Sequence, residues 1–571
     1  MKSYIYNKVS VTARKSLLLL LAPCSLLLAG CNDFLDELPD NRTEANTEDK
    51  IKQLLVSAYP TSDHMAFTEY GSDNVDYMGP TFTNSTRFLD QCYTWEDISE
   101  ADNQSPENYW QDMYNCIETA NMALEGIESM GGPTTQNLKA SQAEALLCRA
   151  YAHFMLVNLF AKHYDSNDDT SLGISYVTTT EKELNPKYQR ETVKENYAHI
   201  AEDIEKALPN VSDNYSVAKY HFNKNAAYAF ATRFYLYYEK YDKAIECANT
   251  VLGTNPASML RDWAVLNTMP DGTDLQQDPT TLHMVDANLS CNLLLLTSYS
   301  MQSITWYYCR YSHNAYIGKY ETIGAYKYEG IGLAALWGGQ YNSYAYLVKR
   351  YAGSGLDSWT QWRLPYLREV TDQATGNGYT HTVYPAFTGD EVLLNRAEAY
   401  VMMKQYDKAC EDLTTWVRNV SRAKNFTVTT EVAKNFETSF PYSYDAVDNE
   451  GNVTPKGSIE STPKKHLNPK FAIDEEGSVQ ESLIQLVLQC RRYETLQEGK
   501  RWFDIKRWGI EIPRRTMNSD GYPEKITDWL TVDDPRRAIQ IPQTVISAGY
   551  EPNPRLSEEN GEIATNKCIK E

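Results

Sequence analysis

Two segments that lie far apart in the sequence carry the same helix-pair pattern, and this repeat limits the fold more than any other feature. In segments 225–258 and 390–423, a tyrosine stands six residues before the same Tyr-Asp-Lys-Ala unit, which begins at Tyr241 in the first segment and at Tyr406 in the second. The aromatic residue and the small alanine suit two closely packed helices. The spacing resembles the 34-residue tetratricopeptide repeat, including Pro256 at its end, so it predicts an array of helical pairs.

Apolar periodicity predicts further helices at 110–124, 142–160 and 195–208, and the last two read as a third helical pair split by an insert. Residues 259–380 are different, because they are rich in Gly, Tyr, Trp, Asn, Ser and Thr and show no sustained helical period. Loops of this length in a compact domain are usually functional or disordered, and the aromatic content argues against disorder. The predicted fold is therefore all-α, a tetratricopeptide-like array with a large loop-rich insertion.

The N-terminus has the pattern of a targeting signal. Residues 1–30 contain four basic residues and no acid, and an apolar stretch at 17–28 ends in Leu28-Ala29-Gly30-Cys31. This stretch is too short for a membrane-spanning helix and resembles the bacterial lipobox, in which the cysteine after the cut is lipidated. An ordinary secretory signal with an incidental cysteine is the alternative. We predict that Cys31 carries the lipid and anchors the chain to a membrane.

The net charge argues against nucleic acid as a partner. The formal charge is -22, with 76 acidic and 54 basic residues, and removal of the four basic residues of the signal lowers it to -26. Such a surface repels phosphates, so we expect no nucleic-acid partner.

The nine cysteines beyond Cys31 include no CxxC pair, which supports neither a regular disulfide framework nor a zinc ribbon. Most read as small buried residues, and one or two disulfides remain open.

Motifs spread over the mature chain resemble those of the SusD/RagB family of surface glycan-binding lipoproteins. After Cys31 comes Asp-Phe-Leu-Asp at 33–36, and Arg491-Arg492-Tyr493-Glu494 precedes the specific run Glu-Gly-Lys-Arg-Trp-Phe-Asp-Ile-Lys-Arg-Trp-Gly at 498–509. The sequence departs from the family at Gly173-Ile174-Ser175, where a Gly-x-Pro is common, and at its C-terminal end. The resemblance implies a SusD-like fold, a lipid-anchored position at the outer-membrane surface of the cell, glycan binding and a SusC-like TonB-dependent transporter as the partner.

The charged residues of the 491–509 run read as scaffold rather than as catalytic groups. Arg491 and Glu494, like Glu498 and Arg501, are three residues apart, so on a helix each couple is expected to form an ion pair. The apolar residues beside them predict a packed helix whose ion pairs set its orientation. A catalytic interpretation would need an acid/base pair in a cleft.

Motifs for catalysis, metals and cofactors are weak or missing. The sequence has no P-loop or GxSxG, and its nine histidines show no HxxxH or HxH spacing. His153 reads as a core residue. The acidic stretch 165–169 resembles the start of a calcium loop, but Thr170 and Tyr176 replace the required glycine and glutamate. We therefore predict no metal site, no cofactor and no enzymatic activity.

Aromatic and charged residues in loops are the candidates for ligand contact. Sugars present C–H faces that stack on aromatic rings, and hydroxyls that pair with Asp, Asn, Gln and Arg. With 42 tyrosines, the chain is well supplied with such rings. Two loop regions hold the predicted ligand-binding residues: Asp73, Arg87, Tyr93, Trp95, Trp306, Tyr307, Arg310 and Trp337.

These observations predict a surface lipoprotein that binds a glycan or other nutrient and passes it to a TonB-dependent transporter. Two alternatives stay open: an all-helical glycan-degrading enzyme, and a structural repeat adaptor without sugar binding. The predicted segments are a signal peptide (1–30), a lipid-anchored segment (31–60), an N-terminal helical region (61–258), the aromatic insertion (259–380) and a C-terminal repeat with the 491–509 signature (381–571).

Overall fold

The computed structural model describes residues 45–79, 82, 84–183, 186–270, 278–299, 309–323, 349–353, 356–360 and 363–555. Cys31, Trp306, Tyr307 and Trp337 lie outside these residues. Within the described part of the chain, no helix combines the length and hydropathy needed to cross a membrane.

Most of the regular structure is helical. The helices are α2 (Glu48–Leu55), α3 (Met65–Gly71), α4 (Arg87–Thr94), α5 (Pro106–Ser129), α6 (Gln136–Phe160), α7 (Val193–Ala207), α8 (Lys224–Tyr237), α9 (Tyr241–Leu252), α10 (Trp263–Leu266), α11 (Pro279–Met284), α13 (Ala315–Ile317), α15 (Gly389–Met402), α16 (Tyr406–Val420), α17 (Thr430–Ser439), α18 (Val479–Glu494), α19 (Arg501–Arg507) and α20 (Gln543–Ser547). Short 3₁₀ or π turns are η1 (Val56–Ala58), η2 (Leu208–Asn210), η3 (Ala218–Tyr220), η4 (Pro256–Met259), η6 (Gly318–Thr322) and η8 (Pro535–Arg537).

The structure corrects the all-α prediction, because it also contains small antiparallel sheets. The strands are β1 (Asp76–Tyr77), β2 (Asn292–Ser298), β3 (Tyr311–Ser312), β4 (Lys349–Gly353), β5 (Leu356–Thr360), β6 (Leu367–Asp372), β7 (Asn377–Thr388), β8 (Ala446–Val447), β9 (Val453–Thr454), β10 (Ile512–Met517) and β11 (Pro523–Leu530). The largest sheet has the order β2-β7-β6, and the others pair β1 with β3, β4 with β5, β8 with β9 and β10 with β11. A helical period was missing from 259–380 because this segment supplies strands β2 to β6 and the start of β7.

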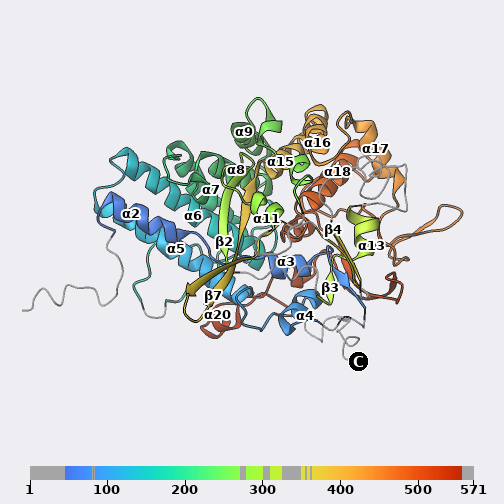
Figure 1. Cartoon of the computed structure of the whole chain (residues 1–571), viewed down its shortest axis with the longest axis horizontal. Coiled ribbons are helices and arrows are strands. Elements are labelled where there is room, and N and C mark those ends of the chain that lie inside the picture. Colours follow the sequence, from blue (N-terminus) through green and yellow to red (C-terminus); the bar gives the residue numbers. More distant parts are fainter. Residues whose placement is uncertain are drawn as a thin grey trace, which may run out of the picture. The chain divides into compact units, whose positions relative to one another are not determined.

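The predicted helical pairs form, and the two repeats turn in the same way. Helix α8 packs on α9 and α15 packs on α16, while α15 also packs on α9, so the pairs are neighbours (Figure 1). Between the helices, Glu239 and Lys404 occupy equivalent positions in the left-handed region, with φ of 59° and 57°. The next residue in each turn donates its N–H to a carbonyl five residues back, Lys240 to Tyr235 and Gln405 to Tyr400, both at 2.8 Å. These bonds satisfy carbonyls at the helix ends.

Side-chain caps define where the other helices begin. Ser105 accepts the Asn108 N–H at 3.2 Å and Pro106 follows it, which starts α5. Thr192 and Glu195 form a capping box at the start of α7. Helix α7 packs on α6 despite the 161–192 insert between them, as the split-pair prediction required.

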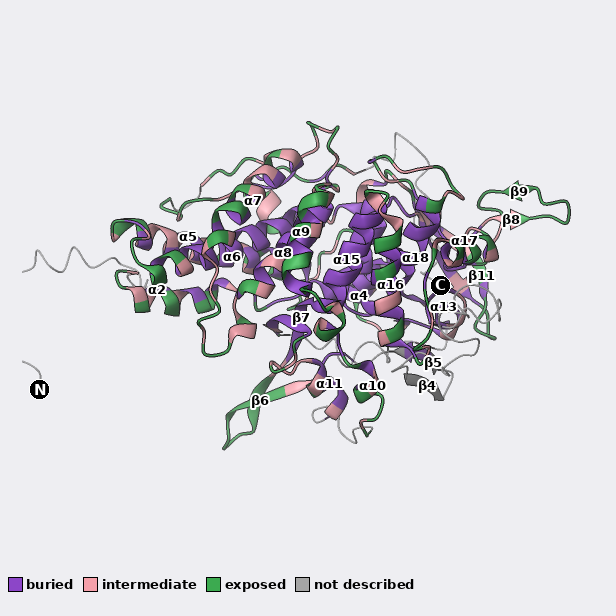
Figure 2. Cartoon of the chain, turned by 90° about the horizontal axis from the view of Figure 1, so that it is seen from above, coloured by how far each residue is buried: buried purple, intermediate pink, exposed green. Residues whose placement is uncertain are grey.

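The core runs through helices that are buried on all sides. Every residue of α6 from 141 to 160 is buried, as are residues 480–494 of α18 and 389–401 of α15. The charged residues that these helices carry, such as Arg149 and Arg491, are paired inside the protein, with Asp203 and Glu398. In Figure 2 these helices are coloured as buried, whereas the β6–β7 and β8–β9 hairpins are largely exposed.

Candidate functional site

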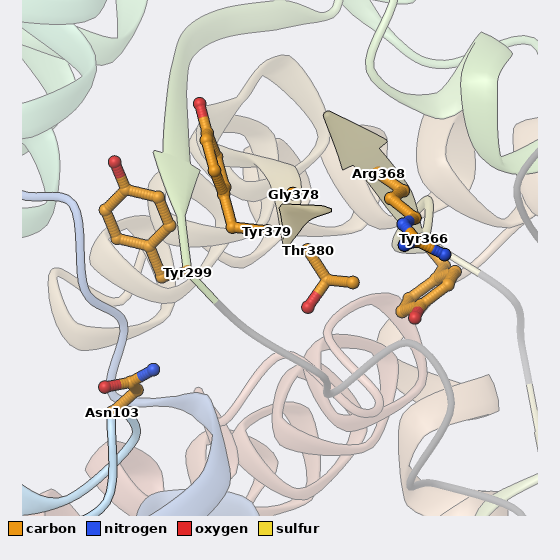
Figure 3. A pocket seen from close by; sticks show the side chains of 7 residues that line it. All are labelled: Asn103, Tyr299, Tyr366, Arg368, Gly378, Tyr379 and Thr380. Carbon is orange, nitrogen blue, oxygen red and sulfur yellow. The ribbon is translucent and has the colours of Figure 1, made fainter. Parts of the chain in front are cut away.

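A hollow of about 410 Å³ lies beside the β6–β7 hairpin (Figure 3), and we call it the tyrosine hollow after the three tyrosines among its lining residues. Its lining residues are Asn103, Tyr299, Tyr366, Arg368, Gly378, Tyr379 and Thr380. All but Asn103 belong to the predicted 259–380 insertion. None of them was among the predicted ligand residues.

Strand ends and strand register bring these residues together. Tyr299 follows β2, its N–H donates to the Thr61 carbonyl at 3.0 Å, and Asn103 lies just before the Ser105 cap of α5. In the β6–β7 ladder, Arg368 stands opposite Thr380 and Glu369 stands opposite Tyr379. The strands approach so closely that a Cβ on Gly378 would lie 2.0 Å from the Glu369 carbonyl oxygen.

Two of the tyrosines form an exposed aromatic corner. The rings of Tyr299 and Tyr379 meet edge to face with centroids 5.2 Å apart, and their exposed fractions are 46% and 37%. Tyr379 donates its hydroxyl to Glu369 Oε2 at 2.5 Å, and this hydrogen bond raises the pKa of Tyr379 to about 12. The hydroxyl therefore stays protonated at neutral pH, while the ring face remains open to solvent.

The other side of the hollow carries a positive charge. Figure 3 shows Tyr366 and Arg368 on the side opposite Tyr299. Arg368 is exposed and donates from Nη2 to the Gly376 carbonyl at 3.0 Å. The arrangement therefore combines aromatic faces for stacking with amide, hydroxyl and guanidinium groups for hydrogen bonds.

Three predicted ligand residues are buried in the described structure. Asp73 is 6% exposed and is held by Arg501 through Nε–Oδ1 and Nη2–Oδ2 contacts of 2.8 and 3.0 Å. Burial by itself would raise the pKa of Asp73, but the Arg492 and Arg501 guanidiniums outweigh it and hold that pKa well below its usual value. Its carboxylate is thus a structural ion-pair partner.

Tyr93 and Trp95 pack around one arginine. The Arg514 guanidinium carbon lies 4.1 Å from the centroid of each ring, and Tyr93 also stacks on Tyr311 at 4.0 Å. Trp95 donates its Nε1–H to the Gly71 carbonyl at 2.7 Å. These aromatic residues therefore hold the β10 strand against the N-terminal helices, and neither lines the 410 Å³ hollow.

The two predicted arginines lie nearer the surface. Arg87, at the start of α4, pairs with Glu100 at 3.0 Å through a side chain that is 70% exposed. Arg310 is partly buried, with Asp90 at 3.7 Å and the Phe82 carbonyl at 3.3 Å. Neither residue lines the tyrosine hollow.

The 491–509 run is scaffold, but its predicted ion pairs are wrong. Arg491 binds Glu398 at 2.6 Å and Asp504 at 2.9 Å, rather than Glu494. Glu494 and Glu498 instead contact Arg363, and Arg501 binds Asp73. Arg491 and Glu494 share α18, yet each is paired with a charge from another segment, and Glu498 lies in the turn before α19. Tertiary contacts, rather than the spacing along one helix, therefore decide which charges meet.

A larger hollow of about 750 Å³ is less suited to a sugar. It lies between the loop after α6, the end of α19 and the segment around η8. Several of its acidic groups are engaged: Asp533 pairs with Lys470 at 2.8 Å, and Asp168 accepts the Thr170 and Ser171 N–H groups. It offers no tyrosine or tryptophan ring for stacking among the described residues that line it.

The described residues contain no group of three His, Cys, Asp or Glu side chains arranged to hold a metal ion. Asp165 and Asp168, in the stretch that resembles a calcium loop, accept backbone N–H groups of their own turn. The eight cysteines in the described part of the chain are all free and buried.

Two family models match the chain. One, described as starch-binding and associating with the outer membrane, matches residues 33–236, and the other, the SusD family, matches residues 299–552. The chain belongs to the SusD family. The 491–509 run and all lining residues of the tyrosine hollow except Asn103 lie inside the second match, and Asn103 lies inside the first.

Solved structures of SusD-like proteins share the fold. A SusD superfamily protein from Bacteroides thetaiotaomicron aligns with a TM-score of 0.59 at 18% identity, over 89% of this chain and 100% of that chain. A putative sugar binding protein from Bacteroides vulgatus gives 0.59 at 17% identity, over 90% and 99%. A SusD-like carbohydrate binding protein from the same species gives 0.52 at 13%, over 91% and 99%. No curated protein matches the chain.

Proposed function

We propose that this SusD-family protein binds a glycan in the tyrosine hollow and delivers it to a SusC-like TonB-dependent transporter. The observation that carries the proposal is the exposed Tyr299–Tyr379 corner, with Tyr366, Arg368 and Asn103 around the same 410 Å³ space. Exposed rings of this kind give a sugar both a stacking face and polar edges. The lipid on Cys31 would keep the protein at the outer-membrane surface, and the helical pairs would form a tetratricopeptide-like scaffold.

The groups around the hollow favour binding over catalysis. Among the described lining residues there is no carboxylate, whereas glycoside hydrolysis generally uses two. Carboxylates whose pKa is raised lie elsewhere in the described structure; among them, burial raises the pKa of Glu69 to about 7 and that of Glu494 to about 8. Both are buried in hydrogen-bonded scaffold, Glu69 with the Gln497 N–H and Glu494 with the Trp416 indole.

Titration of the protein with a panel of oligosaccharides tests the proposal. We expect Tyr299→Ala and Tyr379→Ala each to weaken binding about tenfold, because each removes one stacking face. Tyr220→Ala is the matched control, since Tyr220 is 37% exposed on η3 and does not line the hollow. Release of new reducing ends from the bound oligosaccharide would favour the enzyme alternative.

The delivery step needs a separate measurement. We expect the wild-type protein to co-purify with a TonB-dependent transporter from outer membranes, and the Tyr299→Ala variant to do so equally well. Transporter capture without binding to any glycan would favour the structural adaptor. Glycan binding without transporter capture would contradict the proposed delivery of the glycan to a transporter.

A further inference from the structure

The charge of the tyrosine hollow differs in sign from that of the chain. The protein has a formal charge of -22, yet Arg368 is the one charged residue among the described residues that line the hollow. A guanidinium can also donate to the hydroxyls of an uncharged sugar, but an acidic sugar in particular needs local positive charge to approach so acidic a protein.

The guanidinium of Arg368 is available to a ligand. Among the described residues, no carboxylate lies within ion-pair distance of it. Its Nη2 group donates a hydrogen bond to the Gly376 carbonyl. The neighbouring acid, Glu369, stands opposite Tyr379 in the ladder and accepts the Tyr379 hydroxyl, so its side chain points to the other face of the strand pair from Arg368. Arg368 therefore keeps further N–H donors for an anion.

The surroundings of Arg368 suit an anion that belongs to a sugar rather than a free ion. Tyr366 lies on the same side of the hollow, and Thr380 stands directly opposite Arg368 in the ladder (Figure 3). In Figure 3 the Tyr299 and Tyr379 rings point to the other face of the strand from Thr380, so the Tyr299–Tyr379 corner lines a different part of the hollow from Arg368. An arginine fork binds carboxylate or sulfate oxygens in two parallel hydrogen bonds, while the rings take the sugar faces next to it.

We propose that the hollow selects acidic glycans, with Arg368 binding the carboxylate of a uronic acid or a sulfate ester while Tyr366 beside it and the Tyr299–Tyr379 corner further along the hollow stack on other sugar rings. This inference rests on the proposed glycan-binding function and narrows its ligand class. It predicts that the affinity depends on ionic strength, because the contact is partly exposed to solvent.

The test compares matched ligands and matched variants by calorimetric titration. The ligands are oligogalacturonate, the same oligosaccharide after reduction of its carboxyl groups, and a sulfated galactan oligosaccharide. The variants are Arg368→Gln, Arg368→Lys and, as the control for one lost positive charge, Arg418→Gln on the exposed face of α16.

We expect wild type to prefer one of the two anionic ligands over the reduced one by about tenfold, and Arg368→Gln to abolish this preference. Arg368→Lys should retain part of it, and Arg418→Gln all of it. The sulfated and uronate arms show which anion is bound. Equal binding of the reduced ligand, or an unchanged preference in Arg368→Gln, would overturn the inference while leaving the glycan function intact. Failure of every oligosaccharide in the wider panel to bind would instead overturn the function.

Discussion

Asp73 and Arg501, which are 428 residues apart in the sequence, form a buried ion pair with two hydrogen bonds of 2.8 and 3.0 Å. The pair joins the segment after α3 to the start of α19, inside the 491–509 signature. Arg492 donates to the Asp73 carbonyl as well, so two arginines of the signature hold the same N-terminal residue. The signature therefore holds α18 and α19, near the C-terminus, against the N-terminal segment that follows α3.

Removal of Asp73 should destabilise the protein without selectively affecting the hollow. We expect Asp73→Ala to lower the free energy of unfolding by about 3–5 kcal/mol, because it leaves Arg501 buried without its partner. Urea titration followed by circular dichroism measures this change. Glu100→Ala, which breaks the exposed Arg87–Glu100 pair, is the control and should cost less than about 1 kcal/mol. If the Asp73→Ala protein is stable but fails to bind glycan, Asp73 contacts the ligand and is not only a structural ion-pair partner.

Acid should weaken the fold through His153. This residue is fully buried in α6, its Nδ1–H donates to the Arg149 carbonyl, and its Nε2 accepts the Val177 N–H. Burial lowers the pKa of His153 to about 3, against 6.5 for an ordinary histidine. Between these values the unfolded chain binds a proton that the folded chain does not, so stability falls as the pH drops from 6.5 towards 3.

The His153→Gln variant isolates this contribution. Glutamine cannot titrate, so we expect a smaller loss of stability between pH 6.5 and pH 4 than in wild type, even if the variant starts from lower stability. Urea midpoints across this pH range measure the slope. If both proteins lose stability in parallel, His153 does not contribute to the acid sensitivity.

Gly509 should tolerate no side chain. It adopts φ of +56°, and a Cβ there would lie 2.1 Å from the Asn468 carbonyl oxygen. We expect Gly509→Ala to lower stability by more than the roughly 1–2 kcal/mol of left-handed strain alone. Gly521→Ala is the control, because Gly521 has φ of +76° with nothing within 4 Å of its Cβ position. Similar melting temperatures for the two variants would show that the Asn468 contact relaxes at little cost.

Cys31 tests the predicted anchor. We expect Cys31→Ala to prevent lipidation and to move the protein from the outer-membrane fraction to the soluble fraction of lysed cells. Immunoblotting of the fractions measures this, with Cys92→Ala as the control because Cys92 is buried and free. Membrane retention of Cys31→Ala would favour the ordinary secretory signal and a different means of attachment.

The helices could be predicted from the sequence because their signal is local. The apolar period of 142–160 and the repeated unit at Tyr241 and Tyr406 lie within a few helical turns, and the structure places helices at all three. The β6–β7 hairpin was missed, although Asp372-Gln-Ala-Thr-Gly-Asn and the alternating Tyr379, His381 and Val383 are typical of a turn followed by a strand.

The sequence by itself determined the family motifs, the helical pairs and the buried character of His153, because each rests on neighbouring residues. Only the tertiary structure decided which loop residues face solvent. Asp73, Tyr93 and Trp95 turned inward because Arg501 and Arg514, more than 400 residues further along the chain, bind and stack on them. Tyr299 and Tyr379 stayed outside because the pairing of β2 with β7, whose register no local pattern fixes, ends at Ser298 and Thr382 and leaves both tyrosines beyond it.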